Sequence, residues 1–367
     1  MYRLNGDGLK KRQLILGLLA IAAIVALVVW GRDRIHFDFA VFRAQLAQAD
    51  WRLLAVGVAC IYLGFVVRSF RWAFLLRHNQ QVSTLSLLGT QVIGFTAVAL
   101  IGRVADPVRP YLVSKKTGLP LSNQFAVYIV ERLFDLGTMA LIFSSAILLT
   151  TWFGQPGTLP HPELVKKAGY GGMLLTLAGA VFLVAVRLAG GVVATFLEGA
   201  FGLFSKKLGQ AAGSKIHAFH TGLDTMRSFS EFAVVALVSL GMWLLILLAY
   251  LETARAFVAS PQLASMTVAK CVLLLAASGT ASVFQLPVVG WFTQIGLVAA
   301  AITGLFGATP EAATACGGAL LLVTFLSIVP VGLIWAQFEH VSLRRVAAES
   351  GHAGEELQAA ENAAPAE

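Results

Sequence analysis

Charged residues are concentrated between positions 102 and 135 of a sequence that is otherwise strongly apolar. The stretch contains Gly102, Arg103, Asp106, Arg109, Glu131, Arg132 and Asp135. A charge at membrane depth is costly unless it is paired or faces a water-filled cavity, so such a group indicates a functional site. Because guanidinium groups bind carboxylates and phosphates through paired hydrogen bonds, the stretch predicts a salt-bridged site for an anionic group.

The spacing of these residues suggests how they could meet. Glu131 and Asp135 are four residues apart, so both carboxylates share one face of a helix, with Arg132 rotated away by about 100°. If the preceding segment packs against this helix, its Arg103 and Arg109 are the expected partners of the carboxylates. The alternative is that the charges mark the cytoplasmic end of a helix and fix its topology, because long side chains reach the interface at little cost.

Two further groups of residues are candidates for the same site. Arg68 and Arg71 end an early apolar segment beside Trp72, which favours anchoring at the membrane interface, although Arg71 could instead reach a phosphate. Polar but uncharged candidates follow in the second half, at Gln285, Gly290 and Gln294. Such a segment can offer hydrogen bonds to a lipid headgroup, or it can be a kink held by its own side chains.

Composition defines the class of protein. Hydrophobic residues make up 57% of the 367 residues and charged residues 13%, and the mean hydropathy is +0.78. These values predict an integral membrane protein. At about 20 residues per spanning helix, the chain has room for roughly eight membrane elements. The net charge is +8, and the Lys and Arg residues lie between apolar segments. Their placement indicates membrane orientation and attraction to anionic lipid rather than nucleic-acid binding.

The sequence gives no support for a metal, a cofactor or a catalytic module. Cys60, Cys271 and Cys316 lie in apolar segments without metal-ligand spacing, so they are expected to behave as small buried hydrophobes. The histidines show no zinc-binding pattern, and there is no glycine-rich phosphate loop ending in Lys-Ser or Lys-Thr. We therefore expect neither metal nor cofactor, and no enzymatic activity.

The apolar pattern predicts an all-α polytopic protein. Spanning helices are expected near 13–30, 52–76, 133–153, 170–188, 233–251 and 312–336, the third of them beginning near Ser122. Glycine and proline interrupt two further segments, 85–118 and 267–309, which predicts broken or re-entrant helices. Residues 189–230 alternate aromatic and basic side chains, which is typical of an amphipathic helix at the cytoplasmic surface. The alanine- and glutamate-rich tail, 347–367, is expected to be disordered.

The basic residues predict orientation. Of the 27 Lys and Arg residues, 19 lie in five segments. These are the N-terminus, the turn at 68–77 after the second span, the 103–132 stretch, the 187–227 segment and the pair Arg344 and Arg345. By the positive-inside rule these segments and both termini are cytoplasmic. Residues 85–118 then enter the membrane and return from the inside, and 267–309 do so from the outside. The transmembrane domain, 1–346, therefore divides into inverted repeats at about 13–153 and 170–337.

These residues also carry a resemblance to a known family. The sequence resembles the transmembrane region of lysylphosphatidylglycerol synthases, within a wider group of flippase-like bacterial and archaeal membrane proteins. The resemblance lies in Arg71 and Trp72, in the stretch from Gly102 to Leu112 and in the Glu131-Arg132-Leu133-Phe134-Asp135 element. The resemblance covers about 50–337. It implies movement of a polar lipid between leaflets, with the chain in the bacterial cytoplasmic (inner) membrane.

Two departures from the family limit what the resemblance implies. Asp106 stands where the family usually has glutamate, which is conservative, whereas Gln294 stands where a glutamate is common and so removes a carboxylate. No soluble aminoacyltransferase domain is recognised after Ala336, so lysine transfer is not implied.

Three functions remain open at this point. The first is a translocase that binds the headgroup of an anionic phospholipid or glycolipid in a cavity near the bilayer midplane, in which Arg103 and Arg109 contact phosphate and Glu131 and Asp135 hold them. The second is a membrane enzyme or accessory subunit acting on lipid-linked sugars, with Asp106 or Glu131 as acid or base. The third is a scaffold that binds lipid-synthesis enzymes through 189–230.

Overall fold

The computed structural model describes residues 37–153, 162–203, a few positions between 205 and 213, 228–283 and 289–342. Within these residues all regular structure is helical, and five helices are long and apolar enough to cross a membrane. The protein is therefore an all-α polytopic membrane protein. The expected first span at 13–30, the tail at 347–367 and most of the amphipathic segment after residue 203 lie outside the described residues.

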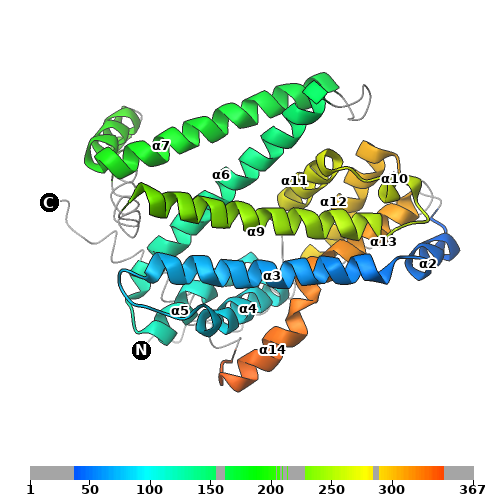
Figure 1. The fold of residues 1–367 in the computed structure, drawn as a ribbon, viewed down its shortest axis with the longest axis horizontal. Helices are drawn as coiled ribbons and strands as arrows, with labels where there is room; N and C mark the ends of the chain where they lie inside the picture. Colours follow the sequence, from blue (N-terminus) through cyan, green and yellow to red (C-terminus); the bar gives the residue numbers. More distant parts are fainter. Residues whose placement is uncertain are drawn as a thin grey trace, which may run out of the picture.

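Two long helices, α3 (Trp51–Leu76) and α9 (Phe229–Arg255), form the centre of the molecule and run antiparallel (Figure 1). Asp50 caps the start of α3 through its side chain, and its backbone N–H donates to Ala256 O at 2.8 Å, beside the end of α9. At the opposite end Arg77 forms an ion pair with Glu231. Gly57 lets the helices approach closely, because an added Cβ would lie 2.9 Å from Thr253 Oγ1.

A broken hairpin follows α3 and occupies the half of the molecule near the C-terminus of that helix (Figure 1). It consists of α4 (Thr84–Ile101), a short turn η1 (Arg103–Ala105) and α5 (Val108–Thr117). Gly102 ends α4 with φ 90° and ψ −173°, a conformation that is essentially restricted to glycine. The chain then continues into α6 (Leu121–Phe153), which starts well before the apolar segment at 133.

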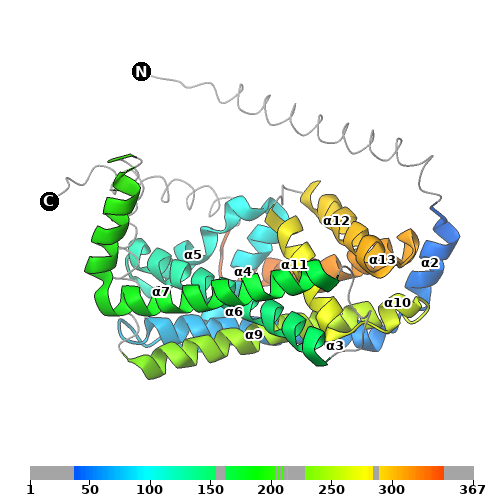
Figure 2. The same cartoon turned by 90° about the horizontal axis from the view of Figure 1, so that it is seen from above.

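The second half repeats this plan in the opposite half of the molecule (Figures 1 and 2). After α9 come α10 (Pro261–Ala264), α11 (Val268–Val283) and α12 (Val289–Phe306). The closing span is α13 (Pro310–Leu321), a π-helical turn η2 (Leu322–Leu326) and α14 (Ile328–Phe338). At this break Tyr62 Oη donates to Ser327 O at 2.9 Å, so another helix satisfies part of the interrupted backbone.

Contacts between the halves follow the same inverted plan. Helix α4 of the first hairpin packs on α14, and α11 of the second packs on α6. The hairpins also meet directly, because Trp291 Nε1 at the start of α12 donates to Ala99 O near the end of α4 at 2.9 Å. The broken segments expected from the sequence therefore come together from opposite halves of the molecule.

The peripheral helices are α2 (Phe39–Ala47), which packs on α13, and α7 (Pro162–Gly202), which packs on α6. Helix α7 bends at Ala189, where φ is −143° and ψ is 45°, and its last turns point away from the rest of the helix (Figure 2). The bend coincides with the expected start of the amphipathic segment at 189.

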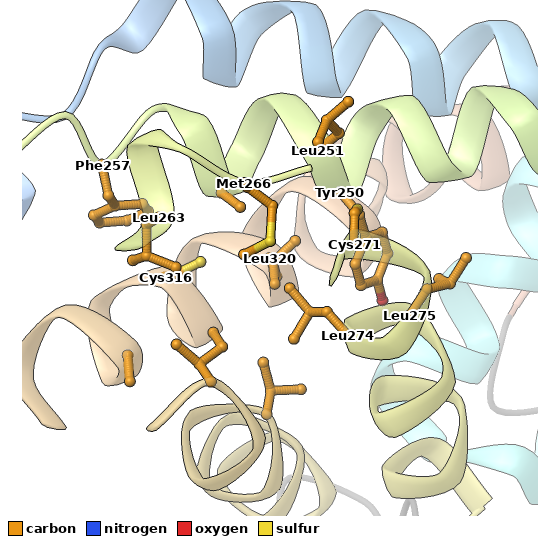
Figure 3. Close-up of a cluster of buried hydrophobic side chains, with 14 of the residues drawn as sticks. Tyr250, Leu251, Phe257, Leu263, Met266, Cys271, Leu274, Leu275, Cys316 and Leu320 are labelled. Carbon is orange, nitrogen blue, oxygen red and sulfur yellow. The ribbon is translucent and has the colours of Figure 1, made fainter. Parts of the chain in front are cut away.

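Both halves have buried apolar clusters, and the first half also contains buried charge. In the second half an apolar cluster surrounds Phe257, Met266 and Leu274 and includes Cys271 and Cys316 (Figure 3). All three cysteines of the chain are buried and unpaired by disulfides, as expected. The corresponding region of the first half contains the charged residues described next.

Candidate functional site: a buried arginine-carboxylate cluster

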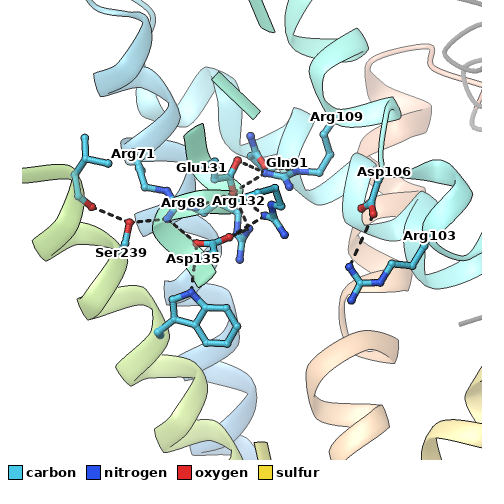
Figure 4. Close-up of polar contacts among 12 residues, drawn as sticks. Arg68, Arg71, Gln91, Arg103, Asp106, Arg109, Glu131, Arg132, Asp135 and Ser239 are labelled. Carbon is cyan, nitrogen blue, oxygen red and sulfur yellow. Dashed lines mark hydrogen bonds and ion pairs between the residues drawn. The ribbon is translucent and has the colours of Figure 1, made fainter. Parts of the chain in front are cut away.

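Six charged side chains meet between α3, α5 and α6 (Figure 4). This charged cluster consists of Arg68, Arg71, Arg109, Glu131, Arg132 and Asp135. Arg68 and Arg71 are three residues apart on α3, and the two carboxylates are four residues apart on α6, so each helix presents its pair on one face. Four members are less than 5% exposed, Arg68 is 8% exposed, and the Arg132 side chain is 32% exposed.

Glu131 is the centre of the charged cluster, because all four arginines contact its carboxylate. Its Oε1 lies 2.7 Å from Arg68 Nη1 and 2.8 Å from Arg71 Nη2. Arg132 Nη2 is 3.1 Å from the same oxygen. Arg109 Nη2 donates to both oxygens, at 3.0 and 2.8 Å. A single buried carboxylate therefore ties α3, α5 and α6 together.

Asp135 forms a second centre one turn further along α6. Arg71 Nη1 donates to Asp135 Oδ1 at 2.7 Å, and Arg132 Nη2 lies 3.0 Å from Oδ2. The second half of the protein contributes neutral partners from α9. Trp243 Nε1 donates to Asp135 Oδ1 at 3.3 Å, and Ser239 Oγ accepts from Arg71 Nη1 at 2.7 Å.

Arg109 is the most enclosed arginine, with no exposed surface. Its Nε donates to Gln91 Oε1 on α4 at 3.0 Å. Three aromatic rings surround its guanidinium carbon, at 4.5 Å for Phe95, 5.1 Å for Trp72 and 5.7 Å for Tyr128. Cation-π contacts of this kind stabilise a charge that has left water. The α4–α5 hairpin thus places an enclosed guanidinium against Glu131.

The arrangement around these residues is closed rather than an open cavity. Three of the four arginines have side chains at most 9% exposed, and Arg132 is the member at the edge. Even so, hydrogen-bonding capacity is left over. Five buried donor atoms in and beside the charged cluster have neither a hydrogen-bond nor an ion-pair partner among the described residues: Arg71 Nε, Gln91 Nε2, Arg109 Nη1, Gln124 Nε2 and Arg132 Nε.

The structure places the candidate residues of the sequence in different regions. Arg71, Arg109, Glu131, Arg132 and Asp135 come together in the charged cluster. Arg109 is a partner of Glu131, as expected.

The expectation that Arg103 also pairs with these carboxylates is wrong. Arg103 lies 44% exposed at the hairpin tip, where its Nη1 is 3.9 Å from Asp106 Oδ2. The α-helix breaks at Gly102 and restarts only at Val108. Figure 4 shows this pair apart from the charged cluster.

The neutral candidates of the second half also lie elsewhere. Gln294 is buried on α12, with Nε2 3.5 Å from Ser278 Oγ, and Ser278 in turn contacts Tyr250 Oη at 2.8 Å. Gly290 is buried in the first turn of α12, and Gln285 lies outside the described residues. Gln294 thus contacts the second half rather than the charged cluster.

Sequence reasoning missed several members of the site. Interface anchoring for Arg68 and Arg71 is wrong, because both guanidiniums are buried against carboxylates. The sequence did contain an indication of this pairing. Arg68 and Arg71 are three residues apart on one apolar helix, Glu131 and Asp135 are four apart on another, and the two pairs have opposite and equal charge. Gln91 and Ser239 were also missed, although a lone polar side chain in an apolar span is costly without a partner.

This geometry favours anion binding over proton transfer. A carboxylate held by four guanidiniums is stabilised as the anion, so Glu131 is a poor acid or base. Among the described residues no group of three or more His, Cys, Asp and Glu side chains could hold a metal. Arginine excess and unfilled donors are instead the chemistry that recognises phosphate.

The fold and this site define a polytopic membrane protein with a buried, cationic cluster between α3, α5 and α6. The family model for the lysylphosphatidylglycerol synthase transmembrane region matches residues 14–346, so the chain belongs to this family.

Two similar curated proteins, both described as UPF0104 membrane proteins, come from Methanothermobacter thermautotrophicus. The first is 33% identical over 128 residues, which cover 32% of this chain and 34% of that protein. The second is 26% identical over 251 residues, which cover 64% of this chain and 69% of that protein. The match thus spans about a third of the length of the first relative. No solved structure matches significantly.

Proposed function

We propose that this protein is a lipid translocase of the cytoplasmic membrane that binds an anionic headgroup, of a phospholipid or glycolipid, at the charged cluster. The proposal rests on the charged cluster, in which guanidinium groups outnumber carboxylates. Several buried donor atoms of these side chains also have no hydrogen-bond partner. Uncompensated buried charge is costly, so an incoming phosphate would be stabilised there.

The inverted halves support movement of the headgroup rather than binding alone. Re-entrant helices that meet from opposite halves are typical of transporters, in which one part moves against the other around a fixed site. Here Arg109 is supplied by the first hairpin, Ser239 and Trp243 are supplied by α9 of the second half, and both sets contact the α3–α6 ion pairs. A shift between the halves would therefore change the charged cluster.

The environment of the site supports a lipid cargo. Helices α3, α6 and α9 each contain an apolar window long enough to cross a membrane, and large apolar side chains such as Leu63, Leu136 and Leu237 are exposed on them. A headgroup could enter past Arg132 while its acyl chains stay in the bilayer. We further propose that both termini are cytoplasmic, following the distribution of basic residues.

Purified protein in vesicles tests this function. A fluorescent, tail-labelled anionic phospholipid is mixed into both leaflets, and the fraction reached by an impermeant quencher is followed over time. We expect wild-type protein to expose the inner-leaflet pool and Arg109→Gln to slow exchange about tenfold or more, as removal of a charged hydrogen bond predicts. Arg109→Lys, which retains the charge, should recover part of the rate.

The controls use other arginines of the chain. Arg52 is exposed at the far end of α3, so Arg52→Gln should exchange lipid at the wild-type rate. Arg103→Gln separates the structure from the sequence-based expectation, because Arg103 lies outside the charged cluster and its loss should affect exchange far less than that of Arg109. Exchange that is unchanged in Arg109→Gln would contradict the proposal.

The same vesicles distinguish the other two functions. An altered lipid product, detected by mass spectrometry of the extracted lipids, would indicate an enzyme. If neither lipid exchange nor an altered product is detected, the remaining function is a scaffold for lipid-synthesis enzymes. The structure gives the enzyme less support, since Glu131 is saturated with guanidinium contacts.

A further inference from the structure

The net charge of the charged cluster indicates how many negative charges its ligand carries. The charged cluster holds four arginines and two carboxylates, which leaves two positive charges. The neighbouring pair of Arg103 and Asp106 is neutral as a whole and leaves this surplus unchanged. Five of the six side chains are at most 9% exposed, so their charges are only weakly screened by salt or water, and Arg132 is the one at the edge.

We propose that the headgroup bound at the charged cluster carries a doubly charged phosphate, either a phosphomonoester or a diphosphate, rather than a singly charged phosphodiester. This inference rests on the translocase function proposed above. A phosphomonoester carries about −1.5 to −2 charges at pH 7, which matches the surplus. A phosphodiester carries a single charge and would leave one guanidinium uncompensated.

The unfilled donors support the same choice. Arg71 Nε, Gln91 Nε2, Arg109 Nη1 and Arg132 Nε are buried without a hydrogen-bond partner, and their side chains come from α3, α4, α5 and α6. A terminal phosphate presents three oxygens that strongly accept hydrogen bonds, whereas a phosphodiester has two unesterified oxygens. More of these donors are therefore satisfied by a terminal phosphate.

Arg132 has a particular part in this selection. Its Nη2 contacts both carboxylates, at 3.1 and 3.0 Å, its Nε is free, and its side chain is the most exposed of the four arginines. An entering headgroup meets Arg132 first. Without this residue the surplus falls from two charges to one, which suits a phosphodiester.

The test compares two lipids with identical labelled tails in the vesicle assay: phosphatidic acid, a phosphomonoester, and phosphatidylglycerol, a phosphodiester. At about pH 8 we expect phosphatidic acid to exchange about tenfold faster, and at about pH 5.5 the preference should disappear, because the second phosphate proton has a pKa of about 6. In Arg132→Gln the ratio at pH 8 should fall towards one, whereas the exposed control Arg52→Gln should keep the wild-type ratio.

The outcomes separate this inference from the function on which it rests. Equal exchange of both lipids at pH 8, or faster exchange of phosphatidylglycerol, would overturn the double charge and leave the translocase standing. Exchange of neither lipid would overturn the translocase itself. Adding inorganic phosphate to the phosphatidic acid assay identifies the source of the ligand. Exchange of phosphatidic acid, with or without inhibition by phosphate, supports a lipid cargo, whereas uptake of phosphate into the vesicles without lipid exchange would indicate that free phosphate is the ligand.

Discussion

Replacing Glu131 with glutamine removes the carboxylate that all four arginines of the charged cluster contact, at 2.7 to 3.1 Å. The side chain is buried, and Asp135 alone would then face four guanidiniums. Breaking a buried ion pair by removing one partner costs about 3–5 kcal/mol, because the remaining charge is left uncompensated. We expect Glu131→Gln to lose about this much stability.

A thermal unfolding scan of the detergent-solubilised protein measures the effect. At about 2.1 cal/mol/K of unfolding entropy per residue, the loss corresponds to a fall of about 5 °C in apparent melting temperature for a chain of this size. The matched control is Glu311→Gln on α13. Glu311 is also buried, and its Oε1 accepts from Asp38 N at 3.0 Å, so its cost should be about 1 kcal/mol.

A second substitution tests whether charge is the cause. In Glu131→Gln with Arg109→Gln, one of the uncompensated guanidiniums is removed as well, so the double variant should be about 2 kcal/mol more stable than the sum of the single effects predicts. Equal shifts for Glu131→Gln and Glu311→Gln, together with additive effects in the double variant, would refute the role of Glu131 as the electrostatic centre.

Three further predictions concern the re-entrant hairpins. In Gly94→Ala the new Cβ would overlap Arg109 Cγ, so lipid exchange should fall in the vesicle assay. The control Gly241→Ala adds its Cβ to open space and should exchange lipid at the wild-type rate. Equal rates in the two variants would contradict this prediction. Gly102→Ala places a side chain at φ 90° and should cost about 1–3 kcal/mol, seen as a lower melting temperature. Trp291→Phe removes the hydrogen bond to the other hairpin and should cost about 1 kcal/mol; an unchanged melting temperature would show that the contact is unimportant.

The sequence predicts the apolar helices well, because lipid requires long runs of apolar residues with internally satisfied backbone. The helix expected at 52–76 is found as Trp51–Leu76. The start of α6 shows where hydropathy fails. Hydropathy alone places the apolar segment only from 133, because Glu131 and Arg132 lower it locally, whereas the expected helix start near Ser122 is confirmed at Leu121.

The site was predictable only in part, because its members are distant in the chain. Glu131 and Asp135 could be paired through their spacing, and Arg109 through the expected packing of the hairpin. Arg68 could not be placed so simply, since its partner Glu131 lies 63 residues away and the packing of α3 on α6 is a tertiary property. The exclusion of Arg103 depends on the break at Gly102, which turns the hairpin tip away from α6.

The relation of the two halves illustrates the same limit. Glycine and proline at the two broken segments were sufficient to predict an interruption, which is found at Gly102 in the first segment; entry and return from one side of the membrane stays a prediction. Which residues touch across the halves was not predictable, because the hydrogen bond from Trp291 to Ala99 depends on how two distant hairpins pack.

The central claim is that the charged cluster binds the headgroup of a lipid. An experimental density map of the protein in lipid nanodiscs containing phosphatidic acid tests it most directly. We predict headgroup density within hydrogen-bonding distance of Arg109 Nη1 and Arg132 Nε, the donors that lack a partner here. A map that resolves these side chains clearly and shows only protein atoms around them, under saturating lipid, would contradict the claim.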